Sequence, residues 1–312
     1  MLLFTVNDLV SQVRDQLQEE NTGTVSDSTI LSALNRGNSY AWDIYARHYP
    51  DPLIVHSSVT LNSAKTGFQI PSDAFEQRIQ KVDIVQSGLT YELERLSYRR
   101  TSQFRNSSAG ARPVGYSLQG RFVEVLPSSN SSAFSYECYY VRRPDQLRLQ
   151  QGRISQLTAV AGSDDSTIVV DAIGSSLSTT DSYLKYVNFV NSHTGEIRGS
   201  AEIKSLSGTK ITFKQTPTRT SVLGRTISGD IPSDLEVDDY ITDINGSCVV
   251  FLQQPTTNFL IQYAVSEIRR ALGYDQGQDQ NVLKTFENQI EHTWAGRESS
   301  SRVKRKNHIW RR

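Results

Sequence analysis

The chain has 312 residues, which is enough for two or three modules that each bury an apolar core. Its composition, with 37% apolar and 21% charged residues and a formal net charge of zero, is globular. No apolar run reaches the roughly 18 residues of a membrane span, and the two isolated cysteines, Cys138 and Cys248, exclude a disulfide framework. The first ten residues have neither a basic leader nor a long apolar core, so we expect a soluble protein made in a cytoplasm, with no membrane partner.

Two helices are predicted at the N-terminus. The first opens with a capping-box pattern at Thr5–Asp8 and continues as an apolar stripe at three-and-four spacing. The second starts around Ser26 or Ser28 and stops at the proline-containing stretch Tyr49–Pro52. Gly37 lies inside the second helix, where glycine costs about 1 kcal/mol relative to alanine, so we predict a close helix contact there.

Residues 51–147 are predicted to form a mostly antiparallel β region. Apolar residues alternate with polar ones from Leu53 onwards, and glycine, asparagine and serine separate the alternating segments. One hairpin is predicted to turn at Gln119-Gly120. The stretch Thr101–Ala111 is polar and contains glycine, so we predict a mobile loop there.

Residues 148–254 are predicted to be an inserted all-β module. Short strands recur at regular spacing, and pairs such as Ser207-Gly208 and Asn245-Gly246 separate them. This spacing predicts a small barrel or sandwich and leaves the choice between the two open.

A helix is predicted over Pro255–Asp275, ending at Gly273, and a second one follows it as far as Trp294. The first of them has a buried stripe made of Ile261, Ala264, Val265, Ile268, Ala271 and Leu272. The other long helical patterns lie at the N-terminus, so we expect residues 1–50 and 255–295 to pack as one helical bundle. The predicted fold class is therefore α+β.

No catalytic, cofactor-binding or metal-binding residues are predicted. The five histidines (His48, His56, His193, His292 and His308) are scattered, without the spacing of a metal site, and there is no phosphate-binding loop. The acidic group Asp234, Glu236, Asp238 and Asp239 lacks the spacing of a calcium loop, and we interpret it as a solvated loop.

The charge is distributed unevenly along the chain. Residues 296–312 contain seven basic residues and one glutamate, a net charge of +6, whereas the rest has 26 basic and 32 acidic residues, a net charge of −6. This terminal segment is polar and rich in serine, so we predict that it is disordered in the free chain. It is open whether it stays solvated, docks on an acidic protein surface or grips phosphates.

Four segments taken in order resemble the head-to-tail connector proteins of tailed bacteriophages, also called adaptor or head-completion proteins. They are FQIPSDAFEQRIQKVDIV, YELERLSYRRTSQF, ARPVGYSLQGRFVEVLP and FSYECYYVRRPDQL. In that family a helix pair precedes a strand ending in Leu-Pro-Ser-Asp, an Arg-Pro-x-x-Tyr hairpin, a Tyr-Tyr-Arg-Arg-Pro strand, a C-terminal helix and a basic tail. The resemblance covers Thr5–Leu147 and Pro255–Arg312, and it fails over the inserted module.

The resemblance implies a non-enzymatic virion protein of the neck, without cofactors. It would form a dodecameric ring of copies of itself beneath the portal protein and above a downstream tail or nozzle protein, and line the channel through which DNA passes without specific binding. The sheet would form contacts between copies, and the inserted module could hold tail fibres. The basic tail would dock on the portal through Arg302, Lys304, Arg305, Lys306, Ile309, Trp310, Arg311 and Arg312.

Two other functions remain open. The basic tail favours a nucleic-acid-binding protein, whose affinity for DNA would fall steeply with salt. A carbohydrate-binding or hydrolytic module within residues 148–254 would need exposed aromatic residues or paired carboxylates. Tyr183, Tyr186 and Phe189 alternate there in a way that we interpret as a buried strand face.

Overall fold

The computed structural model describes residues 4–17, 25–48, 50–61, 66–86, 88–105, 112–127, 134–159, 166–223, 225–229, 231–250, 256–274 and 281–289. Helices and antiparallel sheets both occur, which confirms the predicted α+β class. The chain divides into two compact units. The first joins Met1–Tyr45 to Pro144–Arg312, and the second is Ala46–Arg143.

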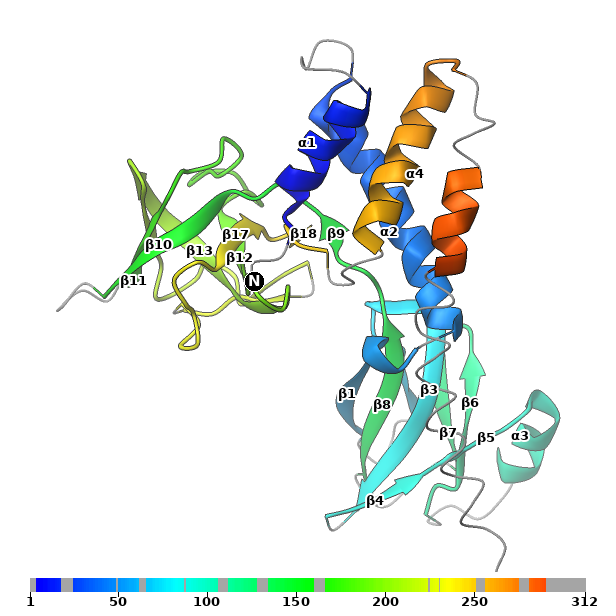
Figure 1. Cartoon of the computed structure of the whole chain (residues 1–312). Coiled ribbons are helices and arrows are strands. Elements are labelled where there is room, and N and C mark those ends of the chain that lie inside the picture. The colour runs from blue at the N-terminus through cyan, green and yellow to red at the C-terminus, as the bar shows by residue number, and fades with distance from the viewer. Residues whose placement is uncertain are drawn as a thin grey trace, which may run out of the picture. The chain divides into compact units, whose positions relative to one another are not determined.

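Both ends of the chain contribute helices to the first unit. Helices α1 (Val6–Leu17), α2 (Asp27–His48) and α4 (Thr256–Ala271) lie side by side (Figure 1), and a further helix spans residues 281–289. The capping box predicted for α1 is confirmed, because Thr5 N donates to Asp8 Oδ2 at 2.9 Å and Asp8 N donates to Thr5 Oγ1 at 3.3 Å. This helical layer is the predicted bundle of the two chain ends.

Contacts between α2 and α4 join residues more than 200 positions apart. The buried hydroxyls of Tyr45 and Thr256 lie 2.9 Å apart, and Arg36 Nε lies 2.8 Å from the Glu267 carboxylate. A Cβ atom placed on Gly37 would lie 3.0 Å from Tyr263 Cδ1, which confirms the close contact predicted there.

The stripe of α4 is shorter than predicted. Its first three turns are buried, but Ala271 is exposed and Leu272 is 46% exposed. The neighbouring helix α1 ends at Leu17, and the last contact of α4 with it runs from Arg269 to the carbonyl of Gln16. The helix ends as predicted, since Gly273 has φ +83° and donates to Arg270 O.

The second unit contains two four-stranded sheets. The first has the order β1 (Ile54–Leu61), β8 (Phe134–Arg142), β3 (Ala74–Gln86) and β4 (Leu89–Glu92). The second has the order β2 (Gly67–Gln69), β7 (Phe122–Leu126), β6 (Gly115–Gln119) and β5 (Glu94–Arg95). Side chains from both sheets, such as Val82, Cys138 and Val123, share one buried core. The predicted turn between β6 and β7 is confirmed, with Gly120 at φ +57°.

The loop predicted over Thr101–Ala111 is wrong in its first half, because helix α3 covers Tyr98–Arg105. Residues 106–111 lie outside the described part of the chain. Ion pairs attach this polar helix to the second sheet: Arg105 binds both carboxylate oxygens of Glu124 in β7 at 2.9 and 2.7 Å, and Arg100 pairs with Glu94 in β5. Polarity in this stretch therefore reflects paired charges.

The inserted module is a closed six-stranded barrel and not a sandwich. Going round it, the strands are β10 (Gly152–Ala159), β11 (Ser166–Val170), β14 (Lys210–Phe213), β13 (Ile197–Ser207), β12 (Tyr186–Val190) and β17 (Tyr240–Asp243). The barrel closes where Gly152 pairs with Ile241 and Arg153 with Tyr240. A short hairpin of β15 (Ser221–Val222) and β16 (Arg225–Thr226) belongs to the same module.

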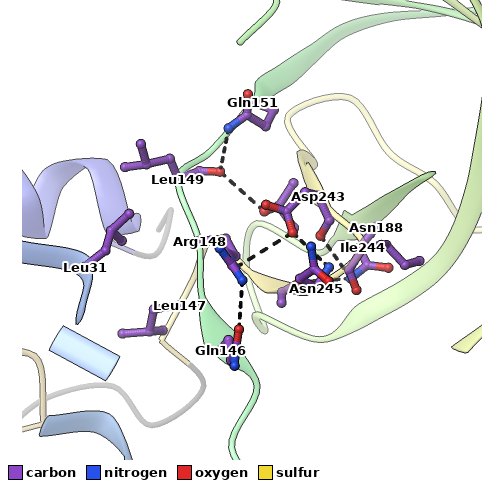
Figure 2. Close-up of polar contacts among 12 residues, drawn as sticks. Leu31, Gln146, Leu147, Arg148, Leu149, Gln151, Asn188, Asp243, Ile244 and Asn245 are labelled. Atoms are coloured by element: carbon purple, nitrogen blue, oxygen red, sulfur yellow. Dashed lines mark hydrogen bonds and ion pairs between the residues drawn. The ribbon is translucent and has the colours of Figure 1, made fainter. Parts of the chain in front are cut away.

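A strap at residues 146–151 joins the barrel to the helical layer (Figure 2). It begins with β9 (Gln146–Leu147), which pairs in parallel with β18 (Gly246–Ser247). On the helical side, Asn35 of α2 accepts a hydrogen bond from Leu147 N at 2.7 Å and donates to Leu147 O at 3.1 Å. On the barrel side, Thr242 donates to Leu149 O at 3.3 Å. This double attachment makes the helices and the barrel parts of one unit.

Candidate interaction surfaces

The predicted docking residues lie outside the described part of the chain. These are Arg302, Lys304, Arg305, Lys306, Ile309, Trp310, Arg311 and Arg312. Their role stays a prediction. The described part of the chain ends with the helix over residues 281–289, and its surfaces belong to the helical layer, the two sheets and the barrel.

An aromatic cluster of Tyr40, Phe259 and Tyr263 lies between α2 and α4. The ring centroids are 5.9 Å apart for Tyr40 and Phe259, 6.1 Å for Tyr40 and Tyr263, and 5.8 Å for Phe259 and Tyr263. Phe259 is buried, whereas Tyr40 is 43% exposed. Burial raises the pKa of Tyr263, which keeps its hydroxyl neutral. Of the three rings, Tyr40 reaches the surface of the helical layer, and sequence analysis missed the cluster. The sequence does contain a signal for the cluster, because Phe259 and Tyr263 lie one helical turn apart and are therefore neighbours on one face of the helix.

Residues that carry the family resemblance contact one another in the second unit. The Tyr140 hydroxyl lies 3.0 Å from both carboxylate oxygens of Asp73, and Arg143 Nε donates to Ala74 O at 3.0 Å. The Arg112 guanidinium lies 3.4 Å from the ring centroid of Tyr91. The first two contacts join β8 to the start of β3 within the first sheet, and the third joins the segment before β6 of the second sheet to β4 of the first.

Neither cysteine is placed for nucleophilic chemistry. Cys138 and Cys248 are buried and unpaired. Burial raises the pKa of the Cys138 thiol to about 12 and raises the pKa of the Cys248 thiol as well, so both are protonated at neutral pH. Across the described ranges, no group of three or more histidine, cysteine, aspartate or glutamate side chains could hold a metal ion.

The acidic group of the barrel lies in a loop whose Asp234, Glu236 and Asp238 side chains are 45–66% exposed, as interpreted from the sequence, but its fourth member, Asp239, is not solvated. Asp239 is buried and accepts hydrogen bonds from Ser192 N and Glu236 N. Arg198 reaches the carboxylates of Asp234, Glu236 and Asp239 at 2.9–3.1 Å. Asp238 pairs with Arg153 at 2.7 Å. These carboxylates are used to fasten the loop to strands β10 and β13.

A second buried carboxylate lies in the barrel. The Glu202 side chain is 0% exposed, and Lys214 Nζ and Lys185 Nζ lie 2.6 and 3.1 Å from its Oε1. Thr218 donates to the same carboxylate through its backbone N–H and its hydroxyl. Although burial opposes ionisation, these donors hold the pKa of Glu202 at about 2. A carboxylate with all these partners stabilises the barrel and is not poised as an acid or a base.

The aromatic residues of the barrel give no binding face. Tyr186 and Phe189 are buried, as predicted, but Tyr183 is 47% exposed, because it precedes β12. A single exposed tyrosine is not the aromatic cluster that carbohydrate binding needs.

The described helices include none with the length and apolar content needed to cross a membrane. No protein-family model matches the chain, and no curated protein has a significantly similar sequence.

Proposed function

We propose that this protein is a structural head-to-tail connector of a tailed bacteriophage. In this function, copies of the chain form a ring, a dodecamer in the family that it resembles, between the portal protein and a downstream tail or nozzle protein. The protein is not an enzyme and acts in the virion neck. DNA passes through the ring without specific binding, and the barrel is free to hold tail fibres.

The observation that carries this proposal is the helical layer built from both ends of the chain. In the connector family this layer faces the portal, and here it presents the partly exposed Tyr40 of the aromatic cluster. The basic residues 297–312 follow the last helix of this layer in sequence. A partner that covers the layer can therefore bury aromatic surface and pair with cationic side chains at once.

The charge distribution also favours this function. The chain without its last 17 residues has a net charge of −6, and a negative channel wall lets DNA slide because like charges repel. A terminal segment that becomes ordered only on docking loses its conformational entropy only when the portal is present. We therefore expect the isolated protein to be monomeric or weakly associated.

Co-expression with the neighbouring portal gene, followed by negative-stain electron microscopy, tests the proposal. We expect rings stacked on portals for the intact chain and none for a chain that ends before Arg297. A stable ring of the isolated protein in light scattering would contradict the assembly order, and catalytic turnover by the purified protein would contradict the function.

The basic tail also favours a second candidate, a nucleic-acid-binding protein. Seven phosphate contacts would make the affinity for DNA fall about a thousandfold or more between low and moderate salt. If the tail serves portal docking, the intact chain has little DNA affinity to lose when the salt is raised. Titration of duplex DNA at two salt concentrations separates the two functions.

A further inference from the structure

Three carboxylates form one row across the first sheet of the second unit. In the strand register, Glu137 of β8 pairs with Asp83 of β3, and Asp83 pairs with Glu92 of β4. Paired residues of antiparallel strands point to the same face, and neighbouring strands are about 4.8 Å apart. The flanking residues Val82 and Cys138 point into the core, so this carboxylate row lies on the opposite face.

The row contains more negative charge than its described neighbours compensate. Like charges directly opposite on a sheet destabilise it. Within the described residues, the row has one ion pair, from Lys81 Nζ to Asp83 Oδ2 at 2.6 Å, while Glu137 accepts a hydrogen bond from the Tyr139 hydroxyl at 2.8 Å. Among the described residues, the ion pair of Lys81 with Asp83 therefore leaves Glu92 and Glu137 without a paired cation.

The central carboxylate is the strongest indication of a missing partner. The Asp83 side chain is 2% exposed, and its Oδ1 is buried without any hydrogen-bond partner. A buried, unpaired carboxylate oxygen is costly, so it is retained where something else supplies a donor. The row is therefore a built site for a positively charged group.

The geometry favours a cationic side chain over a metal ion. The described carboxylates include no group close enough to hold a metal ion, whereas a guanidinium or ammonium group on a long stem can bridge neighbouring carboxylates. One register step away, the rings of His56 and Tyr139 lie 5.7 Å apart, and Lys81 Nζ already lies 4.3 Å from the Tyr139 ring centroid. This platform suits arginine and lysine side chains.

We propose that the carboxylate row binds the basic C-terminal segment, residues 297–312, of a second copy of this chain. We choose this segment because its charge complements that of the row: it has seven basic residues, and the rest of the chain has a net charge of −6. Arg302, Lys304 and Lys306 stand at every second position of the segment, the spacing at which side chains share one face of a strand. The contact between copies is weak and sensitive to salt, in keeping with the weak association that we expect of the isolated protein. It does not rest on the connector function.

A zero-length cross-link between the carboxylate row and the basic segment tests the proposal on the intact protein. Equal amounts of ¹⁵N-labelled and unlabelled chains are mixed and treated with a carbodiimide, which joins a carboxylate to a lysine amine in direct contact. We expect mixed-isotope peptides that join Lys304 or Lys306 to Glu137 or Glu92, and a several-fold loss of them at high salt. Exclusively same-isotope peptides, or none from these lysines, would overturn the proposal.

Matched variants identify the row as the binding surface. Glu137→Gln with Glu92→Gln removes two charges from the row and leaves Asp83 in place, so the fold is retained. Glu196→Gln with Glu287→Gln removes two charges elsewhere. Because the Gln variants also lose the carboxylates that the carbodiimide needs, their readout is self-association at low salt in sedimentation velocity. We expect self-association to weaken at least fivefold in the first pair and to stay unchanged in the second. Equal self-association in both pairs, with circular dichroism unchanged, would assign the contact to non-specific attraction.

Discussion

The hydroxyl of Tyr140 lies 3.0 Å from each carboxylate oxygen of Asp73, a residue 67 positions earlier in the chain. Asp73 belongs to the Ile-Pro-Ser-Asp turn before β3, and its own carbonyl accepts a hydrogen bond from Arg143 N at 2.7 Å. The two motifs that most strongly carry the family resemblance are thus one structural joint. Burial and the neighbouring carboxylate raise the pKa of Tyr140, so the hydroxyl remains a donor at any moderate pH.

Replacing this tyrosine tests the joint. Tyr140→Phe keeps the ring in the core but removes a hydrogen bond to a charged acceptor, which contributes about 1.5–3 kcal/mol. We expect the second unit to lose stability by that amount in chemical denaturation followed by circular dichroism. Tyr139→Phe, one residue away on the outer face, removes a hydrogen bond from a less buried hydroxyl to Glu137, so we expect a smaller loss there. An equal loss in both variants would show that Asp73 is not the reason.

The buried Glu202 makes the stability of the barrel depend on pH. Its pKa is lowered from the ordinary 4.5 to about 2, so the stabilisation is fully present above pH 4.5 and is lost as the pH falls towards 2. The shift corresponds to about 3 kcal/mol at neutral pH. Glu202→Gln should therefore increase hydrogen exchange in β13 and β14 at pH 7, and the difference from the native chain should vanish near pH 2. A difference that is constant with pH would contradict this origin.

Gly37 lies where α2 packs closely against α4. A Cβ atom there lies 3.0 Å from Tyr263 Cδ1 and 3.2 Å from Leu260 Cδ2, so a branched side chain cannot fit without moving α4. We expect Gly37→Val to destabilise the helical layer by about 1–3 kcal/mol, measured as a lower midpoint of thermal unfolding. Adding Tyr263→Ala should restore part of the loss. If the second change gives no recovery, the ring is not the obstacle.

Lys81 is the cation paired with the buried Asp83. Removing the cation leaves a buried charge uncompensated, which destabilises the unit more than removing both charges. We therefore expect Lys81→Met to lower the unfolding free energy of the second unit more than the double change Lys81→Met with Asp83→Asn. Urea denaturation of both variants measures the difference. The reverse order would mean that Asp83 is compensated by another group.

Much of the local structure follows from short sequence patterns. The capping box at Thr5 and Asp8, the stop before Pro50, the turn at Gly120 and the glycine cap at Gly273 are all confirmed. Each depends on hydrogen bonds and backbone angles within a few residues, so neighbouring sequence is enough to specify it.

Other features depend on partners far away in the sequence. Arg105 of α3 binds Glu124 of β7, and Arg198 of β13 pairs with the buried Asp239, whose loop neighbours Asp234 and Glu236 remain exposed. The pairing of Arg153 with Tyr240 closes the strands into a barrel, which excludes a sandwich. The register of β8, β3 and β4 places the three carboxylates in one row.

Composition, period and capping patterns therefore determined the α+β class, the helix ends and the tight turns of this protein, because those signals act over a few residues. Only the tertiary structure decided which charges are buried, how the barrel closes and which carboxylates stand opposite one another. These properties arise when strands and helices that are distant in the chain pack together and exclude water between them. A local sequence pattern does not specify which distant side chain packs against a given residue.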